Sequence, residues 1–307
     1  MKNAFLDARS AADIDAIAKK IHADLDYRDG AVSLDEVRDL LRLDRKYYNP
    51  EDPDLLDEVI HKLKRGAMQI VMRPMLLLEA IKKHDLRALY FPDKKRILID
   101  ANIPELKKRW SESHEISHSF IPWHQEFMLG DDKETLSPQC SQQIEAEANY
   151  GSGRLIFPQA VFHTACRSAA IDIAYIRQLA KQFGNTITST LWRSVEDSDD
   201  LLFALVCDHP IHADPSALPV THFVESRSFS KQFKGASIAE IYGFLKTFCA
   251  ARKSGPLGEA ELLLSDTNGD RHVFHVECFS VTHNTLVLGT WRRIQSGRVF
   301  VPTEIAL

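Results

Sequence analysis

The feature of this sequence that most constrains its fold is a pair of histidines four positions apart, His114 and His118, in the stretch SESHEISHSF. Side chains at this spacing lie one above the other on the same face of an α-helix. A helix over this stretch would therefore aim both imidazoles at one metal ion. Glu115 would lie close enough to reach a water molecule bound to that metal. The spacing HExxH is typical of zinc peptidases, in which the glutamate is the general base.

A catalytic zinc site also needs a third protein ligand and an open position for water. His124 lies ten positions after His114, which is the metzincin spacing HExxHxxGxxH. That pattern needs a glycine to turn the chain back toward the metal, where this chain has Ile121 followed by Pro122. We therefore discount His124 as a ligand. It stays a candidate for the edge of the site, as an oxyanion donor, or for a surface or supporting position.

Glu145 is the second candidate for the third ligand, in a predicted helix over 141–158. Residues two apart do not share a helix face, so only one of Glu145 and Glu147 can be the ligand. Glu145 lies beside the apolar residues Ile144 and Ala148, while Glu147 is displaced from them. Alone, the tripeptide EAE would indicate a solvated charge pair. Beside HExxH, it favours Glu145 as the residue that completes the site.

Cys140 lies five residues before Glu145, at the end of a polar segment, 125–140, that we predict to be a loop. A thiolate is a strong zinc ligand, so Cys140 could fill the open position and hold the enzyme inactive until it is displaced or oxidised. The alternative is an ordinary loop or packing cysteine. The chain has five cysteines and no CxxC pair, which indicates a reducing cytoplasm rather than a disulfide framework.

Composition and charge narrow the class of protein further. The hydrophobic fraction of 44% and the charged fraction of 26% are ordinary for a soluble globular protein. The formal net charge of -5 does not favour nucleic acid as the main partner. The sequence MKNAFLDARSAADID has no apolar core of signal-peptide length, and the longest apolar runs are too short to span a bilayer. We therefore expect a cytoplasmic protein without a membrane partner.

The spacing of apolar residues predicts an α+β chain of two domains. Helical periodicity dominates residues 1–196, apart from a hairpin around a DKK turn over 88–100. The acidic segment 196–200, EDSDD, is the predicted boundary. Strand patterns then dominate 201–307, with one helix predicted over 237–253. This gives a mainly helical first domain with a small sheet, followed by a smaller α+β domain.

Two helices near 171–195 have the spacing of a DNA-reading helix-turn-helix. Within IRQLAKQFGNTITSTLWR, apolar Leu179 and Ala180 precede a glycine turn and a threonine-rich helix. Arg177, Lys181 and Arg193 supply positive charge. A helix pair packed on the peptidase core would give the same pattern, and the acidic net charge favours that alternative. A DNA-binding regulator with a non-catalytic metal site is nevertheless our second functional hypothesis.

Two separated segments resemble the ImmA/IrrE family of bacterial metallopeptidases. RWSESHEISH (109–118) is similar to the family's RFTLAHELGH, and EAEANYGSGRLIFP (145–158) is similar to its ExxANxFAxxLLMP. The resemblance covers roughly residues 85–195, including the hairpin. Ser117, Gly151 and Ser152 depart from the family pattern, all at packing positions.

The resemblance implies a zincin-like peptidase fold with one zinc ion per chain. The family pattern assigns the zinc to His114, His118 and Glu145, and the base role to Glu115. It implies hydrolysis of a peptide bond in a protein substrate. Family members commonly cleave a partner helix-turn-helix repressor, which relieves repression in stress, mobile-element or phage-defence settings. Relatives often carry a sensor-like domain after the peptidase, which implies a regulatory role for 201–307.

Overall fold

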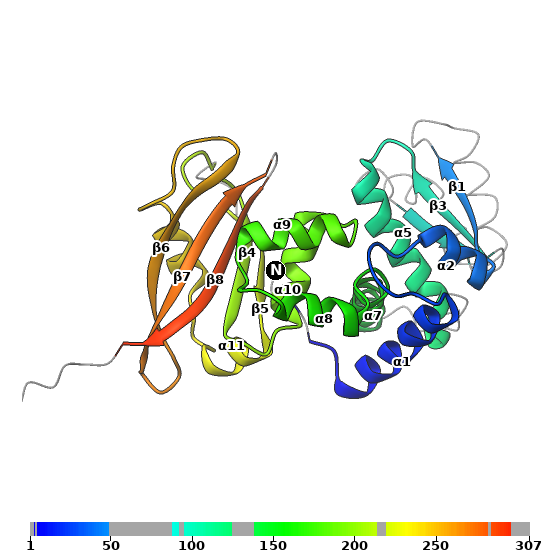
Figure 1. Ribbon diagram of the computed structural model, residues 1–307, viewed down its shortest axis with the longest axis horizontal. Helices are drawn as coiled ribbons and strands as arrows, with labels where there is room; N and C mark the ends of the chain where they lie inside the picture. Colours follow the sequence, from blue (N-terminus) through cyan, green and yellow to red (C-terminus); the bar gives the residue numbers. More distant parts are fainter. Residues whose placement is uncertain are drawn as a thin grey trace, which may run out of the picture. The chain divides into compact units, whose positions relative to one another are not determined.

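The computed structural model describes residues 3, 5–48, 88–91, 95–124, 138–213, 219–281 and 284–295, and most of its elements are labelled in Figure 1. The chain forms two compact units. The N-terminal unit consists of Ala4–Ala165 and Gln178–Thr186, and the C-terminal unit of Met1–Asn3, Cys166–Arg177 and Ile187–Leu307. Within the described residues, no helix is both long enough and apolar enough to cross a bilayer.

The N-terminal unit combines helices with a three-stranded sheet. Its helices are α1 (Ala8–Asp24), α2 (Leu34–Leu41), α5 (Glu105–Phe120), α7 (Pro138–Ile156) and most of α8 (Gln159–Arg167). Its strands are β1 (Asp44–Tyr48), β2 (Ala88–Phe91) and β3 (Arg96–Asp100), in the order β1-β3-β2. β2 and β3 are antiparallel, as the hairpin prediction required, and β1 runs parallel to β3.

Helices α5 and α7 meet at small side chains. Ser113 and Ser117 of α5 and Ser152 of α7 are fully buried, and the hydroxyls of Ser113 and Ser152 share a hydrogen bond. A Cβ at Gly151 would lie only 3.2 Å from Ser117 Oγ. The three positions that depart from the family pattern, at residues 117, 151 and 152, therefore all lie where the two helices are closest.

A buried ion pair ties α5 to the elements before it. Glu112 of α5, only 4% exposed, lies 2.6 Å from Nε of Arg38 in α2 and 3.1 Å from Nη1 of Arg45 in β1. A carboxylate so buried stays charged only when it is paired in this way. The contact fixes α5, which carries the HExxH residues, against α2 and β1.

The C-terminal unit is built on a five-stranded antiparallel sheet in the order β5-β4-β8-β7-β6. The strands are β4 (Leu202–Cys207), β5 (Val220–Glu225), β6 (Gly255–Ser265), β7 (Arg271–Ser280) and β8 (Thr285–Ile294). Helices α11 (Arg227–Gln232) and α12 (Ile238–Leu245) follow β5. The predicted strand over 221–229 is thus shorter than expected, because Ser226 caps α11, and the helix predicted over 237–253 ends at Leu245.

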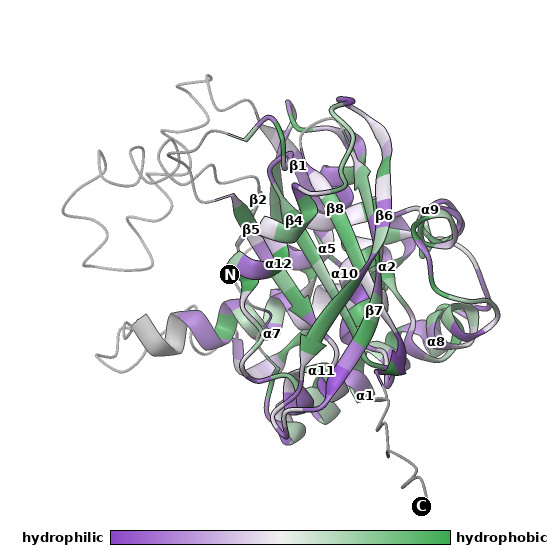
Figure 2. Ribbon diagram, turned by 90° about the vertical axis from the view of Figure 1, so that its left-hand side faces the viewer, coloured by the Kyte–Doolittle hydropathy of each residue, from purple (hydrophilic) through white to green (hydrophobic). Residues whose placement is uncertain are grey.

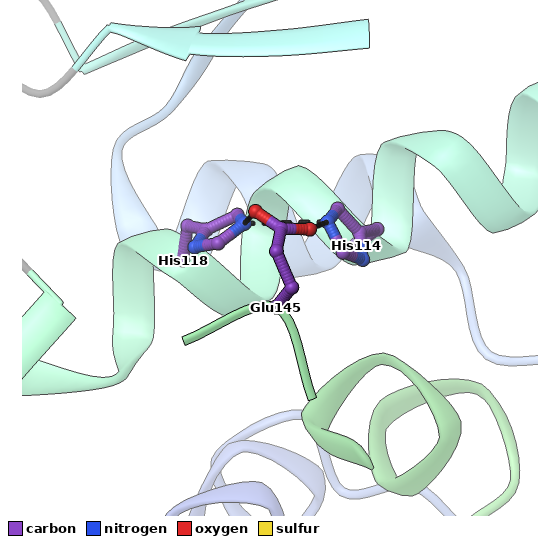
Figure 3. A group of neighbouring side chains, drawn as sticks. All are labelled: His114, His118 and Glu145. Carbon is purple, nitrogen blue, oxygen red and sulfur yellow. Dashed lines mark hydrogen bonds and ion pairs between the residues drawn. The ribbon is translucent and has the colours of Figure 1, made fainter. Parts of the chain in front are cut away.

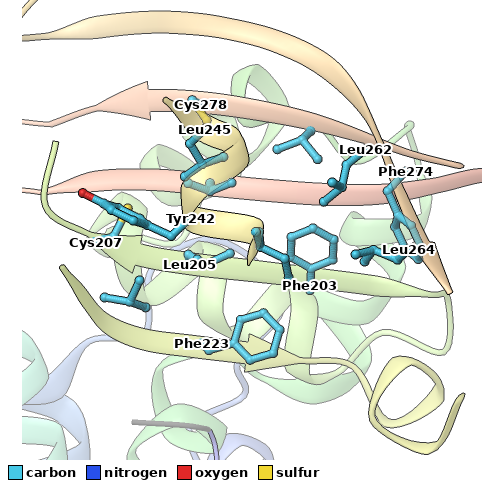
Figure 4. Packing of buried hydrophobic residues seen from close by; sticks show 14 of the residues in the cluster. Phe203, Leu205, Cys207, Phe223, Tyr242, Leu245, Leu262, Leu264, Phe274 and Cys278 are labelled. Atoms are coloured by element: carbon cyan, nitrogen blue, oxygen red, sulfur yellow. The ribbon is translucent and has the colours of Figure 1, made fainter. Parts of the chain in front are cut away.

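Both faces of this sheet are covered around β4. All six residues of β4 are buried, and the strands are largely hydrophobic in Figure 2. On one face, Tyr242 and Leu245 of α12 pack over Leu205 and Cys278 (Figure 4). On the other face, residues of α9 (Ile173–Gln182) and α10 (Ile187–Glu196) pack against β4, β5 and β8. The four cysteines whose side chains are described are free thiols.

The division into units differs from the predicted break at 196–200. Leu191 and Val195 of α10 are buried against the five-stranded sheet, and Ile173 and Ile176 of α9 join the same cluster. Helix α10 and the first half of α9 therefore belong to the C-terminal unit. The prediction had assigned both helices to the first domain. The acidic segment marks a turn between α10 and β4 rather than a boundary between units.

Candidate metal centre

Helix α5 places the HExxH residues and ends directly after them. Its last two turns carry His114, Glu115 and His118, and Ile121 leaves the helix with an extended backbone, φ -82° and ψ 107°. Pro122 follows, and a proline disfavours the helical conformation in the residue before it. A single extended residue, Ile121, therefore ends α5 at the position where a metzincin has its glycine, and residues 122–124 are helical again.

The structure brings the three predicted ligands together (Figure 3). Nε2 of His114 lies 3.2 Å from Nε2 of His118. The carboxylate of Glu145, from α7, lies between the rings, with Oε2 3.3 Å from His114 Nε2 and Oε1 3.7 Å from His118 Nε2.

These donor atoms suit a zinc ion. Ligands about 2.1 Å from a tetrahedral zinc are roughly 3.4 Å from one another. The three separations between these side chains, 3.2, 3.3 and 3.7 Å, lie close to that value. Two imidazole nitrogens and one carboxylate are also the donor set of a known class of catalytic zinc site.

The outer nitrogen of His114 is held by an amide. Nδ1 of His114 lies 3.1 Å from Oδ1 of Asn149 in α7. A carbonyl oxygen can only accept, so Nδ1 of His114 carries a hydrogen. In the neutral ring this tautomer leaves the lone pair of Nε2 for a metal ion.

The protonation of the two histidines depends on burial and on the neighbouring carboxylates. Burial, together with the charge on His114, lowers the pKa of His118 to about 3. Burial also acts to lower the pKa of His114, but the carboxylates of Glu145 and Glu115 outweigh it and raise that pKa. The hydrogen bond to His114 in turn lowers the pKa of Glu145, although burial opposes the shift. His118 is therefore neutral and Glu145 ionised at neutral pH, which are their metal-binding forms.

Glu115 has the character of a proton acceptor that works near neutral pH. Only 8% of it is exposed, and burial raises the pKa of its carboxyl group to about 7, against the opposing charge of His114. A hydrogen bond from the backbone of Tyr90, in β2, favours the ionised form. A pKa near 7 suits a group that takes a proton and then returns it.

Glu147 is more buried than the sequence argument placed it, and His124 takes the supporting position that the sequence left open. Glu147 is 2% exposed, whereas the side chain of Glu145 is 56% exposed. The sequence argument placed Glu145 nearer the buried side of the helix, but Glu147 is the more buried of the two. Glu145 is nevertheless the residue whose carboxylate lies beside the histidines. His124 is fully buried rather than at the site edge, with Nδ1 3.1 Å from His118 Nδ1 and Nε2 2.9 Å from Glu147. The sequence contained no local signal for this contact.

The backbone of Cys140 lies in the first turn of α7, not in a loop, because that helix begins at Pro138. The rest of the predicted loop, 125–137, lies outside the described residues, as does the Cys140 side chain. The role of Cys140 as an inhibitory zinc ligand therefore stays a prediction.

A second group of donors among the described residues lies in the C-terminal unit and consists of Glu259, His275 and Glu277. Alternation along β7 and the pairing of Glu259 with Glu277 put them on one face of the sheet. Nε2 of His275 lies 3.5 Å from the exposed carboxylate of Glu259, and Glu277 accepts a hydrogen bond from the backbone N–H of Ile173. All three of these donors are partly or fully exposed.

Comparison with known proteins concerns the segment of the chain that carries the first of these groups. Residues 72–193 match the family profile described as the IrrE N-terminal-like domain, a metallopeptidase-like family. No curated protein matches the chain. A solved Mycobacterium tuberculosis transcriptional regulator is similar in fold, with a TM-score of 0.53 and 13% identity over 91% of this chain and 88% of that one. The family that residues 72–193 match is therefore the one that the sequence resembles.

Proposed function

We propose that this protein is a zinc-dependent endopeptidase with one zinc ion per chain. The observation that carries the proposal is the convergence of His114, His118 and Glu145 within 3.7 Å, with buried Glu115 next to the first ligand. A structural zinc site has four protein ligands and needs no base. Three ligands beside a carboxyl group whose pKa is about 7 favour catalysis instead.

The chemistry divides between the metal and the chain. Zinc, when bound, supplies a Lewis acid that activates water and polarises the scissile carbonyl. Glu115 takes the proton of the attacking water and delivers it to the leaving amine. His114 and His118 keep their Nε2 lone pairs for the metal, and Asn149 holds the ring of His114 in place.

We further propose that the substrate is a partner helix-turn-helix repressor in the cytoplasm, and that its cleavage relieves repression in a stress or defence response. The family resemblance supports this class of substrate. The likeness in fold to a transcriptional regulator is consistent with a role in gene control. The C-terminal unit would then act as the regulatory part.

The alternative, a DNA-binding regulator that reads DNA with α9 and α10, receives less support. Leu191 and Val195 face the sheet of the C-terminal unit. Arg193 is 3% exposed and lies 3.1 Å from Glu196 and 3.5 Å from Asp197. Its charge is therefore neutralised within the helix and buried away from a phosphate backbone.

The test is cleavage of candidate repressors encoded beside this gene, using purified protein and Glu115→Gln. The substitution keeps the size of the side chain and leaves the three ligands in place. We expect wild-type protein to cut such a substrate, and Glu115→Gln to retain zinc but lose at least about a hundredfold in rate. A wild type that contains no zinc and binds duplex DNA would reverse the ranking of the two functions.

A further inference from the structure

A line of buried, hydrogen-bonded side chains runs from His118 away from the metal-binding atoms. His118 Nδ1 lies 3.1 Å from Nδ1 of His124, and His124 Nε2 lies 2.9 Å from Oε2 of Glu147. The three residues are 4%, 0% and 2% exposed, in that order. We refer to His124 and Glu147 together as the His124–Glu147 relay.

The far end of this line is fixed by further donors. Glu147 accepts a hydrogen bond of 2.6 Å from Nε1 of Trp123 and one of 2.9 Å from Nε2 of Gln143. Glu147 therefore receives three hydrogen bonds, counting that from His124. Carboxylates held by several donors stay ionised and accept only. Glu147 is thus a fixed acceptor at the end of the line.

The positions of the hydrogen atoms follow from that acceptor. Since Glu147 accepts, Nε2 of His124 carries a hydrogen atom. A neutral ring has only one, so Nδ1 of His124 is an acceptor. The facing Nδ1 of His118 must then be the donor, and Nε2 of His118 keeps its lone pair. That nitrogen lies 3.7 Å from Oε1 of Glu145 and 3.2 Å from Nε2 of His114.

We propose that the His124–Glu147 relay positions His118 for zinc, by fixing both its tautomer and the orientation of its ring. The proposal rests on the proposed function, because it concerns the same metal centre. A carboxylate behind a ligating histidine commonly orients the ring and strengthens its bond to the metal. Here the carboxylate acts through a second imidazole instead of directly. His124 and Glu147 are positioning residues and touch neither substrate nor metal.

The two ligand histidines are therefore held differently. His114 donates to the neutral amide of Asn149, which is an exposed residue. His118 donates into a buried line that ends in a charge. Hydrogen bonds are stronger in a buried, low-dielectric environment, and stronger again when one partner is charged. We therefore expect zinc affinity to depend on the relay more than on Asn149.

A packing role alone would give a different result. His124 follows the end of α5 and Glu147 lies in α7, so the relay also links these two elements. If that link were its whole contribution, its loss would lower stability and leave the zinc affinity of the folded protein unchanged.

The experiment compares two substitutions at His124 in the full chain. Zinc affinity is measured by competition with a chromophoric chelator, and folding by circular dichroism and thermal unfolding. We expect His124→Leu, which removes the acceptor, to weaken zinc binding by roughly 10- to 100-fold. His124→Asn should recover most of that loss, because its Oδ1 can take the place of Nδ1 as acceptor. Glu147→Gln, which keeps the size and loses the charge, should show a smaller loss.

The matched control is His22→Asn. His22 is a partly buried histidine of the same unit that bonds to the backbone oxygen of Leu155, 2.9 Å away. Its substitution should lower stability without changing zinc affinity. A spectroscopic check comes from ¹⁵N chemical shifts of the histidines in the zinc-free protein. In the wild type, His118 should carry its hydrogen on Nδ1. In His124→Leu, a larger fraction of His118 should carry it on Nε2.

Two outcomes would overturn the inference. One is zinc binding by His124→Leu as tight as by wild type. The other, which decides the matter if that variant does not fold, is a folded Glu147→Gln with unchanged affinity. Either result would leave the peptidase proposal intact, because the wild type would still bind zinc. A wild type that binds no zinc would instead remove the proposed function itself.

Discussion

Gly151 of α7 lies so close to Ser117 of α5 that a methyl group on its Cα would stand 3.2 Å from the serine Oγ and 3.2 Å from the ring of Phe120. The absence of a side chain at this position lets the two helices approach. Their approach brings Glu145 of α7 to the histidines of α5. The close contact is therefore part of how the three proposed zinc ligands are brought together.

A side chain introduced at Gly151 should disturb the contact between α5 and α7, and a larger side chain should disturb it more. Gly151→Ala gains about 1 kcal/mol of helix propensity but overpacks the contact, so we expect a stability close to wild type or slightly lower. Gly151→Val should destabilise the protein by about 3 kcal/mol and weaken zinc binding. Urea denaturation measures the first effect and chelator competition the second.

The control for this prediction is Gly243 in α12. It is exposed, and a Cβ there would have no neighbour within 4 Å. Gly243→Ala should therefore raise stability by up to about 1 kcal/mol. If alanine changed stability equally at the two glycines, and if Gly151→Val were as stable as wild type, the close contact at Gly151 would not be needed for the approach of α5 and α7.

The zinc content of variants should show which of the two groups of donor residues binds the metal, the one with His114 or the one with His275. Wild-type protein should contain one zinc per chain, and Glu145→Ala or His114→Ala should lose it, because a site reduced to two ligands binds weakly. His275→Ala, in the group with Glu259 and Glu277, should retain the metal. Elemental analysis after dialysis measures this. Two zinc ions per chain, or loss of zinc in His275→Ala, would show that the sheet site also binds metal.

Stability in acid should depend on Asp266, next to the turn between β6 and β7. Burial acts to raise the pKa of this carboxyl group, but hydrogen bonds from Gln232, His272 and the backbone of Asn268 and Asp270 outweigh it and lower that pKa. The folded-state pKa is thus below the unfolded value of about 3.9. The stabilisation is present above that value and is lost as the pH falls toward the folded pKa.

Asp266→Asn should accordingly be less stable than wild type at pH 7, and the difference should shrink below about pH 4. Urea denaturation at a series of pH values gives the two curves. Asp270→Asn is a suitable control, because the hydrogen bond to Asp266 comes from the backbone of residue 270 and not from its side chain. Parallel curves for wild type and Asp266→Asn would show that Asp266 does not titrate as described.

The packing of α10 gives a prediction that also tests the DNA-binding alternative. Leu191→Ala should destabilise the protein by about 3 kcal/mol, because this side chain is 1% exposed against the sheet. Lys181→Ala, at an exposed position of α9, should change stability by less than about 0.5 kcal/mol. Unchanged stability in Leu191→Ala, together with loss of affinity for DNA in Lys181→Ala, would favour a DNA-reading role.

Local geometry explains why part of the site could be predicted from the sequence. The spacing of His114 and His118 needs only a helix to bring them together, and the hairpin over 88–100 needs only a turn between two apolar runs. Both patterns are contained within a few residues, so tertiary packing does not alter them. The choice of Glu145 over Glu147 was also predicted, although the burial argument behind it was wrong.

The remaining features depend on contacts between distant segments. Nothing near His124 indicates that its ring lies between His118 and Glu147, since that contact forms only when α7 packs on the end of α5. In the same way, the apolar face of α10 fits any apolar partner. The sequence could not show that this partner is the sheet of the C-terminal unit, which is why the predicted break at 196–200 differs from the division into compact units.

The packing of α10 also determines where the chain can be cut. A fragment that starts at residue 201 would expose the apolar face of β4 and β8 that α10 covers, and exposed faces of this kind cause self-association. It would also lack Asn3, whose side chain bonds to the backbone N–H and carbonyl oxygen of Glu225. The C-terminal unit therefore needs α10 and the first residues of the chain as well as the residues after 200, so a cut at residue 201 would not release it as a complete folding unit.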